Sequence, residues 1–361
     1  MQGETVRAPG RVNLIGEHID YHNLPVLPMA LRQGIRVTYR PRRDRSIRAV
    51  SAGFGAREFE WTGRLERAAP GDWENYLRAA AQAVADRWGA GAGLDAEIEA
   101  DLPPAAGLSS SSALIVAFTL CLLGARGLKV SFAELMEVLP EGEHFVGTRG
   151  GGMDHAASLA SRAGFASLVR FQPAEVSYVA VPGDWAFLVA HSLQRAEKSG
   201  AAREAYNRIR SAGEAALAKH GGNLSAEERA AYDHVTSEAA RVDDGVEAMR
   251  RGDASCFGQL LAASHLSLRD RLHVSTAALD DLVDTAMAGG ALGARLTGAG
   301  FGGCAVVLSR RADRPRLREH LTAEFYSKRA GFQPAQHLID AEPGSGALAN
   351  VVHSGINHLA E

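Results

Sequence analysis

The feature that most constrains this chain is a glycine-serine loop followed by a long apolar run. Residues 107–113 read Gly-Leu-Ser-Ser-Ser-Ser-Ala, and residues 114–123 are almost entirely apolar. Proline and glycine before the loop end a strand, and serine is favoured where a helix begins. A helix that begins in such a loop offers free N–H groups and its positive dipole end to an anion. The loop therefore predicts either a nucleotide-phosphate site, with a serine hydroxyl for a magnesium ion, or an ordinary capped core helix.

The composition is that of a globular protein of about two domains. The 361 residues are 46% hydrophobic and 22% charged, and the net charge is −3, which argues against nucleic acid or an anionic membrane as the main partner. No apolar run reaches the roughly 20 residues of a membrane span, and the N-terminus has no signal-peptide pattern. Three scattered cysteines are typical of buried thiols in a reducing compartment. We therefore expect a cytoplasmic protein.

A second polar stretch lies near the N-terminus. A short strand at residues 4–8 is expected to end at Pro9 and Gly10, and five polar or charged groups follow: Arg11, Glu17, His18, Asp20 and His22. Burying such groups is unfavourable unless they share partners or a ligand. The histidine spacing also fits a metal site, but nothing here predicts a helix and no third ligand cluster is near. A polar-ligand pocket is favoured over a metal site or a solvated loop.

The hydrophobic pattern predicts a mixture of strands and helices. Strands are predicted within residues 33–62, at 94–100, three times between 165 and 191, at 305–308 and at 337–340. Helices are predicted at 73–88, 109–125, 200–219, 226–251, 253–271, 276–288 and 313–329. One more helix is predicted to begin at residue 131, and a separate alanine-rich helix is predicted to end at about residue 162.

A glycine-rich stretch at residues 298–303 formally matches the G-x-G-x-x-G pattern of dinucleotide-binding enzymes. That pattern needs a strand before it and a helix after it, whereas the apolar residues after Gly303 predict a strand. An oxidoreductase is therefore disfavoured. The sequence also lacks the Walker pattern of nucleotide sites and the G-x-S-x-G of serine hydrolases.

Three stretches in fixed order resemble the signature motifs of the kinases named for galactokinase, homoserine kinase, mevalonate kinase and phosphomevalonate kinase. They are residues 8–18, 103–113 and 296–304. The first, with Val-Leu-Pro-Met-Ala at 26–30, is similar to the galactokinase signature. Further landmarks of the galactokinase branch lie at residues 73–76, 151–154 and 267–270. The resemblance therefore runs along nearly the whole chain.

The resemblance implies two α+β domains, at residues 1–172 and 173–361, with an active site in the cleft between them. It implies ATP-dependent phosphorylation of the anomeric (C1) hydroxyl of galactose, giving galactose 1-phosphate and ADP. Two alternatives stay open: a kinase for N-acetylgalactosamine or another related sugar, and a non-catalytic galactose- and ATP-binding regulator. Retention of Arg11, Glu143 and Asp154 favours catalysis, because a sensor needs no phosphoryl-transfer apparatus. The expected partners are the sugar and ATP with Mg²⁺, and a monomer is consistent with the sequence.

The resemblance also implies a role for individual residues. Asp154 would be the base for the anomeric hydroxyl and Arg11 would stabilise charge beside it; a carboxylate next to an arginine has a lowered pKa, so Asp154 should be ionised. The sugar would be held by Glu17, His18, Asp20, Gly151 and Asp154. The nucleotide would be held by Trp73, Gly107, Leu108, Ser109, Ser110, Ser111, Ser112, Gly298 and Gly300, and magnesium by Ser111 and Glu143.

The sequence also departs from the usual galactokinase pattern. Ile19, His22 and His155 replace the usual Thr, Asn and Gln. Ile19, the serine run and the glycines at 150–152 look more like the N-acetylgalactosamine kinase branch. Gly150 and Gly152 replace bulkier residues beside Asp154, so we expect them to make space near the sugar C2. A sugar-facing tyrosine usually follows a His-Ser-Leu stretch. At the simplest spacing Lys198 stands there, and with a short insertion Tyr206 does, which we favour.

A charge argument separates galactose from galacturonate. The resemblance places Glu17 at the sugar 6-hydroxyl, where galacturonate carries a carboxylate. Two like charges about 4 Å apart repel by about 4 kcal/mol at an effective dielectric near 20. We therefore expect galacturonate to be a poor substrate.

Overall fold

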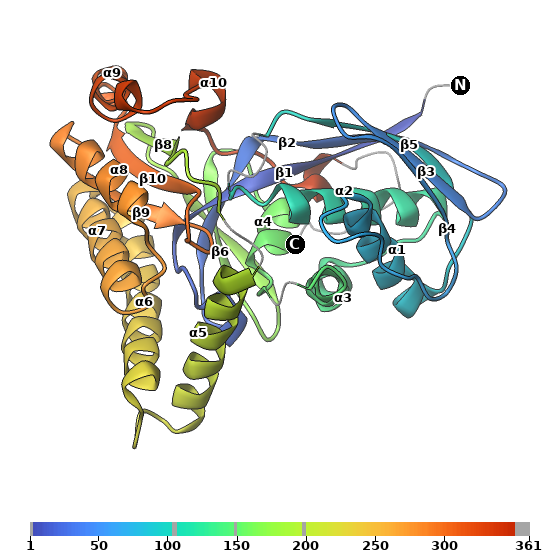
Figure 1. The fold of residues 1–361 in the computed structure, drawn as a ribbon, viewed down its shortest axis with the longest axis horizontal. Helices are drawn as coiled ribbons and strands as arrows, with labels where there is room; N and C mark the ends of the chain where they lie inside the picture. The colour runs from blue at the N-terminus through green and yellow to red at the C-terminus, as the bar shows by residue number, and fades with distance from the viewer. Residues whose placement is uncertain (1–2, 103–106, 148–149, 197–199, 351–361) are drawn as a thin grey trace.

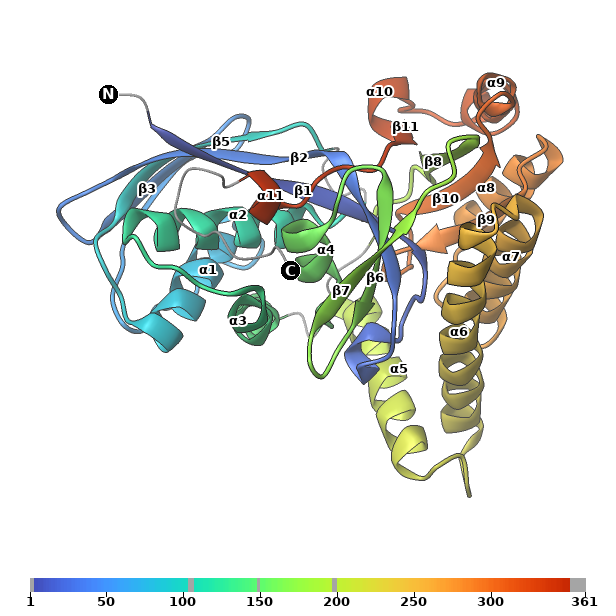
Figure 2. The ribbon, with the colours of Figure 1, turned by 180° about the vertical axis from the view of Figure 1, so that it is seen from behind.

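The computed structural model describes residues 3–102, 107–147, 150–196 and 200–350. Lys198 therefore lies outside the described residues. Figures 1 and 2 show two sheet-and-helix halves side by side, with a helical hairpin extending away from them. This is the α+β architecture that the family resemblance implies. The boundary predicted after residue 172 falls between β6 (Phe165–Arg170) and β7 (Glu175–Ala180), a small two-stranded sheet, and stays a prediction.

The first half is built on a five-stranded sheet. Its strands are β1 (Glu4–Ile15), β2 (Leu27–Pro41), β3 (Ser46–Ser51), β4 (Gly55–Glu60) and β5 (Leu94–Ala100), in the order β1-β2-β5-β3-β4. Neighbouring strands are antiparallel except β3 and β5, which are parallel. Buried and exposed residues alternate along β5, so one face of the sheet is the core.

The helices of this half are α1 (Glu74–Trp88), α2 (Ser110–Ala125), α3 (Phe132–His144) and α4 (Met153–Ala160) (Figure 1). Two of them, α2 and α4, pack against the sheet, and α1 and α3 pack against those helices. Helix α2 is buried from residue 112 to 123, because its apolar side chains face neighbours on all sides. The serine loop therefore sits at the end of a helix held rigidly in the core.

Strand β1 is longer than the sequence predicts. Pro9 and Gly10 do not end it; instead its register with β2 shifts between Pro9 and Arg11. Proline is tolerated here because β1 is an edge strand with a bulge. A Cβ on Gly10 would lie 2.7 Å from the carbonyl oxygen of Leu108, and the Arg11 N–H donates to that oxygen at 3.1 Å. The bulge thus brings Arg11 against the serine loop.

The second half is built on an antiparallel sheet in the order β11-β8-β10-β9. These strands are β8 (Trp185–His191), β9 (Gly293–Thr297), β10 (Cys304–Arg310) and β11 (Leu338–Ala341). The sequence analysis missed β9. This half also contains α7 (Ala254–Asp270), α8 (Ala277–Ala288), α9 (Arg314–Glu324) and α10 (Pro334–His337), and α11 (Ala347–Asn350) contacts α4 and β1.

The projecting hairpin consists of α5 (Gly200–Ala218) and α6 (Ala226–Arg250) (Figure 1). The base of α5 contacts the short 3₁₀ helix η1 (Asp20–His22) of the first half. In the described part of the chain, no helix has both the length and the apolar character to cross a membrane.

Helix α7 and strand β9 approach each other closely at two glycines. A Cβ on Gly258 would collide with the carbonyl of Leu292, and a Cβ on Gly293 would collide with the carbonyl of Gly258. This contact sets the position of β9, which leads directly into the glycine-rich stretch at 298–303.

We predict that Gly258→Ala destabilises the protein by about 1–3 kcal/mol, since the backbones must separate. Without that contact the substitution would be favourable by about 1 kcal/mol, because alanine suits a helix better than glycine. Gly183→Ala is the control, since its Cβ would meet no atom within 4 Å. Urea unfolding measures both; equal midpoints for the two variants would contradict the prediction.

Candidate active site

One pocket gathers most of the side chains predicted to bind or act on a ligand. Its walls come from β1, α2, α3 and α4 on one side, and from α5 and the β9–β10 connection on the other. From the predicted set the lining contains Arg11, Glu17, His18, Asp20, Gly107, Ser109, Ser111, Ser112, Glu143, Gly151, Asp154, Tyr206, Gly298 and Gly300. Segments nearly 290 residues apart in sequence therefore meet in one place.

Three predicted nucleotide residues are not part of the lining. Leu108 is buried in the core, Ser110 is the first residue of α2, and Trp73 directly precedes α1. The Trp73 indole N–H donates to the carbonyl oxygen of Phe54 at 3.2 Å. Their assigned roles stay predictions.

Asp154 is held between an arginine and a serine. The Arg11 Nε donates to Asp154 Oδ1 at 2.6 Å, and the Ser109 hydroxyl donates to Asp154 Oδ2 at 2.5 Å. The Arg11 Nη1 also donates to the Gly107 carbonyl at 2.8 Å. Burial opposes ionisation of Asp154, but the Arg11 charge and these hydrogen bonds outweigh it, so its pKa lies below its ordinary value. Asp154 is therefore ionised at neutral pH.

The same contacts leave the start of α2 open to a ligand. Ser109 is the N-cap residue, in a left-handed conformation (φ 58°), and its side chain makes no capping hydrogen bond. Its hydroxyl is used by Asp154 instead. The first-turn N–H groups of a long core helix thus have no side-chain cap, which is the arrangement that binds phosphate.

Glu143 lies in the same wall, at the end of α3. It is 8% exposed, and its Oε1 accepts a hydrogen bond of 2.5 Å from Ser112. The fully buried His155 places Nε2 3.7 Å from the same oxygen. Ser112 is thus the serine that touches Glu143, while Ser111 also lines the pocket. One carboxylate with one or two hydroxyls fits a magnesium ion, which takes few protein ligands beside phosphates and waters.

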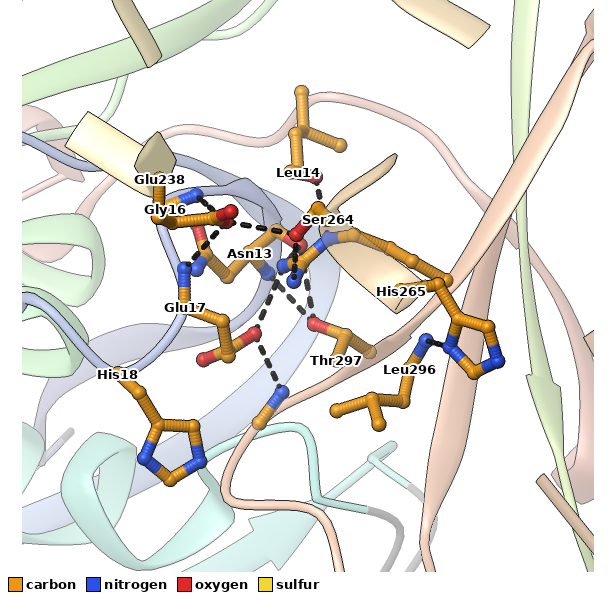
Figure 3. A network of polar contacts seen from close by, with 12 residues as sticks. Asn13, Leu14, Gly16, Glu17, His18, Glu238, Ser264, His265, Leu296 and Thr297 are labelled. Carbon is orange, nitrogen blue, oxygen red and sulfur yellow. Dashed lines mark hydrogen bonds and ion pairs between the residues drawn. The ribbon is translucent and has the colours of Figure 1, made fainter. Parts of the chain in front are cut away.

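The loop after β1 presents Glu17 to the opposite wall. Glu17 Oε2 accepts from the Arg295 guanidinium and from the Gly298 backbone N–H, both at 2.8 Å. Glu238 of α6 accepts the backbone N–H groups of Gly16 and Glu17 at 2.9 and 3.1 Å (Figure 3). The negative charge of Glu17 is therefore neutralised by Arg295.

His18 follows in a left-handed conformation, φ 59°. Its Nε2 lies 3.1 Å from the Ala299 carbonyl and its Nδ1 2.9 Å from the Tyr21 hydroxyl. Burial lowers the pKa of His18, so the ring is neutral. Because a carbonyl only accepts, the proton sits on Nε2. The Tyr206 ring lies 5.4 Å from His18, which brings the favoured tyrosine into the pocket.

Within the described ranges, no basic side chain forms an ion pair with Asp20. Burial raises its pKa to about 7, helped by the charges of Asp154 and Glu17, although the backbone N–H groups of Met153 and Tyr21 act the other way. A Cβ on Gly151 would collide with the Asp20 carboxylate. Gly151 is thus required by close packing.

His22 lies outside the pocket lining. It packs against Gly213 of α5, and burial lowers its pKa to about 4. Within the described ranges, no three His, Cys, Asp or Glu side chains are grouped to hold a metal ion. The geometry therefore gives the metal alternative for His18 and His22 no support.

Several buried polar residues around the pocket escaped the sequence analysis. They include Arg295, Glu238, His234 and Ser264, all less than 1% exposed. An arginine among the apolar residues 291–296 was the available signal, since a buried arginine needs a carboxylate or carbonyl partner.

Comparison with known proteins agrees with this geometry. The "Galactokinase galactose-binding signature" matches residues 2–41, "GHMP kinases N terminal domain" matches 75–162 and "GHMP kinases C terminal" matches 246–328. The chain is 36% identical to the galactokinase of Roseiflexus sp. (strain RS-1), over 95% of this chain and 92% of the relative. It is 37% identical to the galactokinase of Chloroflexus aurantiacus, over 84% and 83%.

Solved structures agree as well. Lactococcus lactis galactokinase complexed with galactose superposes with a TM-score of 0.85 at 27% identity, over 95% of this chain and 94% of that one. The mevalonate kinase of L. major, at 21% identity and a TM-score of 0.67 over 95% and 97%, shares the fold. The chain therefore belongs to the galactokinase family.

Proposed function

We propose that this protein transfers the γ-phosphoryl group of ATP to the anomeric hydroxyl of galactose, giving galactose 1-phosphate and ADP. The observation that carries the proposal is the ionised Asp154, held by Arg11 and Ser109 where the serine loop meets the Glu17–Asp20 segment. Membership of the galactokinase family supports it, as does the likeness to a galactokinase solved with galactose.

Asp154 would orient the attacking hydroxyl. In the transfer, the sugar oxygen bonds to the γ-phosphorus, the bond from that phosphorus to the ADP oxygen breaks, and the hydroxyl proton passes to Asp154. A carboxylate with a lowered pKa is a weak base, so its larger contribution is positioning, with proton transfer late in the reaction. Arg11, beside Asp154 and the Gly107 carbonyl, supplies positive charge where the phosphoryl group passes.

Magnesium would be held at the wall formed by Glu143 and the serine run. Ser111 is our candidate ligand with Glu143, because the Ser112 hydroxyl is already donated to the Glu143 carboxylate. When bound, the ion would neutralise charge on the nucleotide phosphates. The role of Ser112 would then be to orient Glu143.

The choice of sugar depends on Asp20 and on the glycines around Asp154. Gly152 faces Met136 and Phe171 in the core, so it adds no room to the pocket, whereas Gly150 is part of the lining. Of the two glycines expected to make space for a 2-acetamido group, only one can do so. This favours galactose over N-acetylgalactosamine.

The first prediction is that Asp154→Asn lowers kcat by about 10²-fold or more, because orientation and proton transfer are both lost. ATP affinity should be largely kept. Steady-state kinetics with a coupled ADP assay measure the first quantity, and calorimetric titration with ATP measures the second. Turnover near that of the unaltered protein would remove Asp154 from the mechanism.

A second prediction concerns the serine run. Ser111→Ala should raise the magnesium concentration needed for half-maximal activity several-fold, since a direct ligand is lost. Ser112→Ala is the matched variant and should change this requirement less, because its hydroxyl reaches the ion only through Glu143. A larger rise in the magnesium requirement for Ser112→Ala would make Ser112 the direct ligand and Ser111 the residue that orients Glu143.

A third prediction uses the pKa of Asp20, about 7 without ligand. Its ionised form accepts sugar hydroxyl protons, so galactose should bind more tightly as the pH rises from 6 to 8. Linkage for one group with this pKa gives about a tenfold fall in Kd over that range. The pKa of Asp154 lies below its ordinary value, so Asp154 stays ionised over this range and does not contribute to the change.

Calorimetric titration with galactose at several pH values tests this, and Asp20→Asn should flatten the profile. A Kd that rises with pH in the unaltered protein would show that protonated Asp20 is the binding form.

A further inference from the structure

We propose that His18 and Glu17 position the glycine loop, residues 298–303, and through it the nucleotide phosphates. This role is additional to lining the sugar side of the pocket. The inference rests on the proposed function, because it assumes that the glycine loop meets the nucleotide.

Two consecutive residues of the glycine loop are held by two consecutive residues of the segment after β1. Glu17 Oε2 accepts the Gly298 N–H at 2.8 Å, and the next residue, His18, donates from Nε2 to the Ala299 carbonyl at 3.1 Å. These contacts join positions 281 residues apart. These two side-chain hydrogen bonds join the segment after β1 to the start of the glycine loop.

The glycine loop needs such anchors because its backbone cannot form regular structure. Gly298, Gly300, Gly302 and Gly303 all have positive φ, and so does Phe301. Glycine gives up the most backbone entropy on ordering, so an unanchored loop would sample many conformations. The far end of the loop is fixed separately, by the Phe301 N–H to Val274 and the Gly303 N–H to Gln194.

Glu17 can hold the glycine loop in place because three contacts fix the position of Glu17 itself. Its N–H donates to Glu238, its carbonyl lies 3.0 Å from His234 Nε2, and its Oε2 binds Arg295. In the described part of the chain, Glu17 Oε1 accepts no hydrogen bond, so it is available to a sugar hydroxyl. Arg295 is completely buried and also donates to the carbonyls of Asn13 and Leu14, both at 2.8 Å.

The charges around Glu17 are balanced. Glu238 Oε2 pairs with Arg241 at 2.7 Å. The cost of burying Glu238 is further offset by the Ser264 hydroxyl and two backbone N–H groups, which donate to Oε1 (Figure 3). A buried ion pair with all partners present holds one arrangement, while removal of one partner leaves an uncompensated charge. Changing Glu17 would therefore disturb the fold, so His18 is the better residue to test.

His18 has no ring nitrogen left for the sugar. Its Nε2–H is donated to the glycine loop and its Nδ1 accepts from Tyr21. A sugar hydroxyl could bind either nitrogen only by replacing one of these partners. The imidazole thus links the segment after β1 to the glycine loop.

The test measures the Kd of Mg·ADP by calorimetry in the absence of sugar. His18→Ala removes the bond to Ala299 and should weaken Mg·ADP binding about 5- to 20-fold, as expected when a buried carbonyl loses its donor. His18→Gln keeps an N–H donor near the position of Nε2 and should restore most of the affinity. His18→Asn tolerates the left-handed backbone but is too short to reach Ala299, so it should resemble the alanine variant.

Asp20→Asn is the control. Asp20 lies in the same pocket but receives its backbone hydrogen bonds from Met153 and Tyr21, not from the glycine loop. It should weaken galactose binding and leave Mg·ADP affinity within about twofold. Thermal unfolding of each variant separates a loss of nucleotide affinity from a loss of fold. If His18→Ala does not fold, the comparison of His18→Asn with His18→Gln still tests the inference.

Wild-type Mg·ADP affinity in folded His18→Ala or His18→Asn would overturn the inference. Failure of the unaltered protein to phosphorylate galactose, with nucleotide affinities changing as described, would overturn the proposed sugar and support the anchoring role. If the unaltered protein does not bind Mg·ADP, both proposals fall.

Discussion

The ion pair between Arg11 and Asp154 is the interaction on which the site depends. Asp154 is partly buried in the first turn of α4, and without a cation it would be protonated or would destabilise the fold. Arg11 reaches it only because β1 continues through Pro9 and Gly10 with a shifted register. Ser109 then turns its hydroxyl to the same carboxylate and leaves the start of α2 uncapped. One charge requirement therefore joins the strand, the serine loop and α4, and frees a helix N-terminus for phosphate.

A second buried carboxylate, Glu17, is neutralised in a different way and from the other half of the molecule. Its cation, Arg295, comes from β9, and its backbone is held by Glu238 of α6. The segment after β1 is thus continuous in sequence with the first sheet, but its hydrogen bonds are to the second half of the molecule. The two halves of the pocket are joined at Gly298 and Ala299, which is why the glycine loop and the segment after β1 behave as one unit.

Much of this could be predicted from sequence, and the misses have a common physical cause. The helix that follows the serine loop, the start of the helix predicted from residue 131 and strand β5 were predicted within a residue, because each depends on local pattern. The continuation of β1 through Pro9 was wrong, since it depends on the edge position of the strand. Arg295 and Glu238 were missed because a buried charge is explained only by partners far away in sequence. The gathering of Arg11, Glu17 and Asp154 was predictable only through the family resemblance.

The pairing of charges also changes the reason to expect a neutral sugar. From the sequence, the repulsion of galacturonate was expected to come from Glu17, but the negative charge of Glu17 is offset by Arg295. Asp154 is likewise offset by Arg11. No described basic side chain forms an ion pair with Asp20. The one other arginine among the described lining residues, Arg203, has its Nη1 near Gly147, in the wall that contains Glu143. Among the described lining residues, a sugar carboxylate would thus meet Asp20 without a free cation beside it, whereas neutral hydroxyls can donate to that carboxylate.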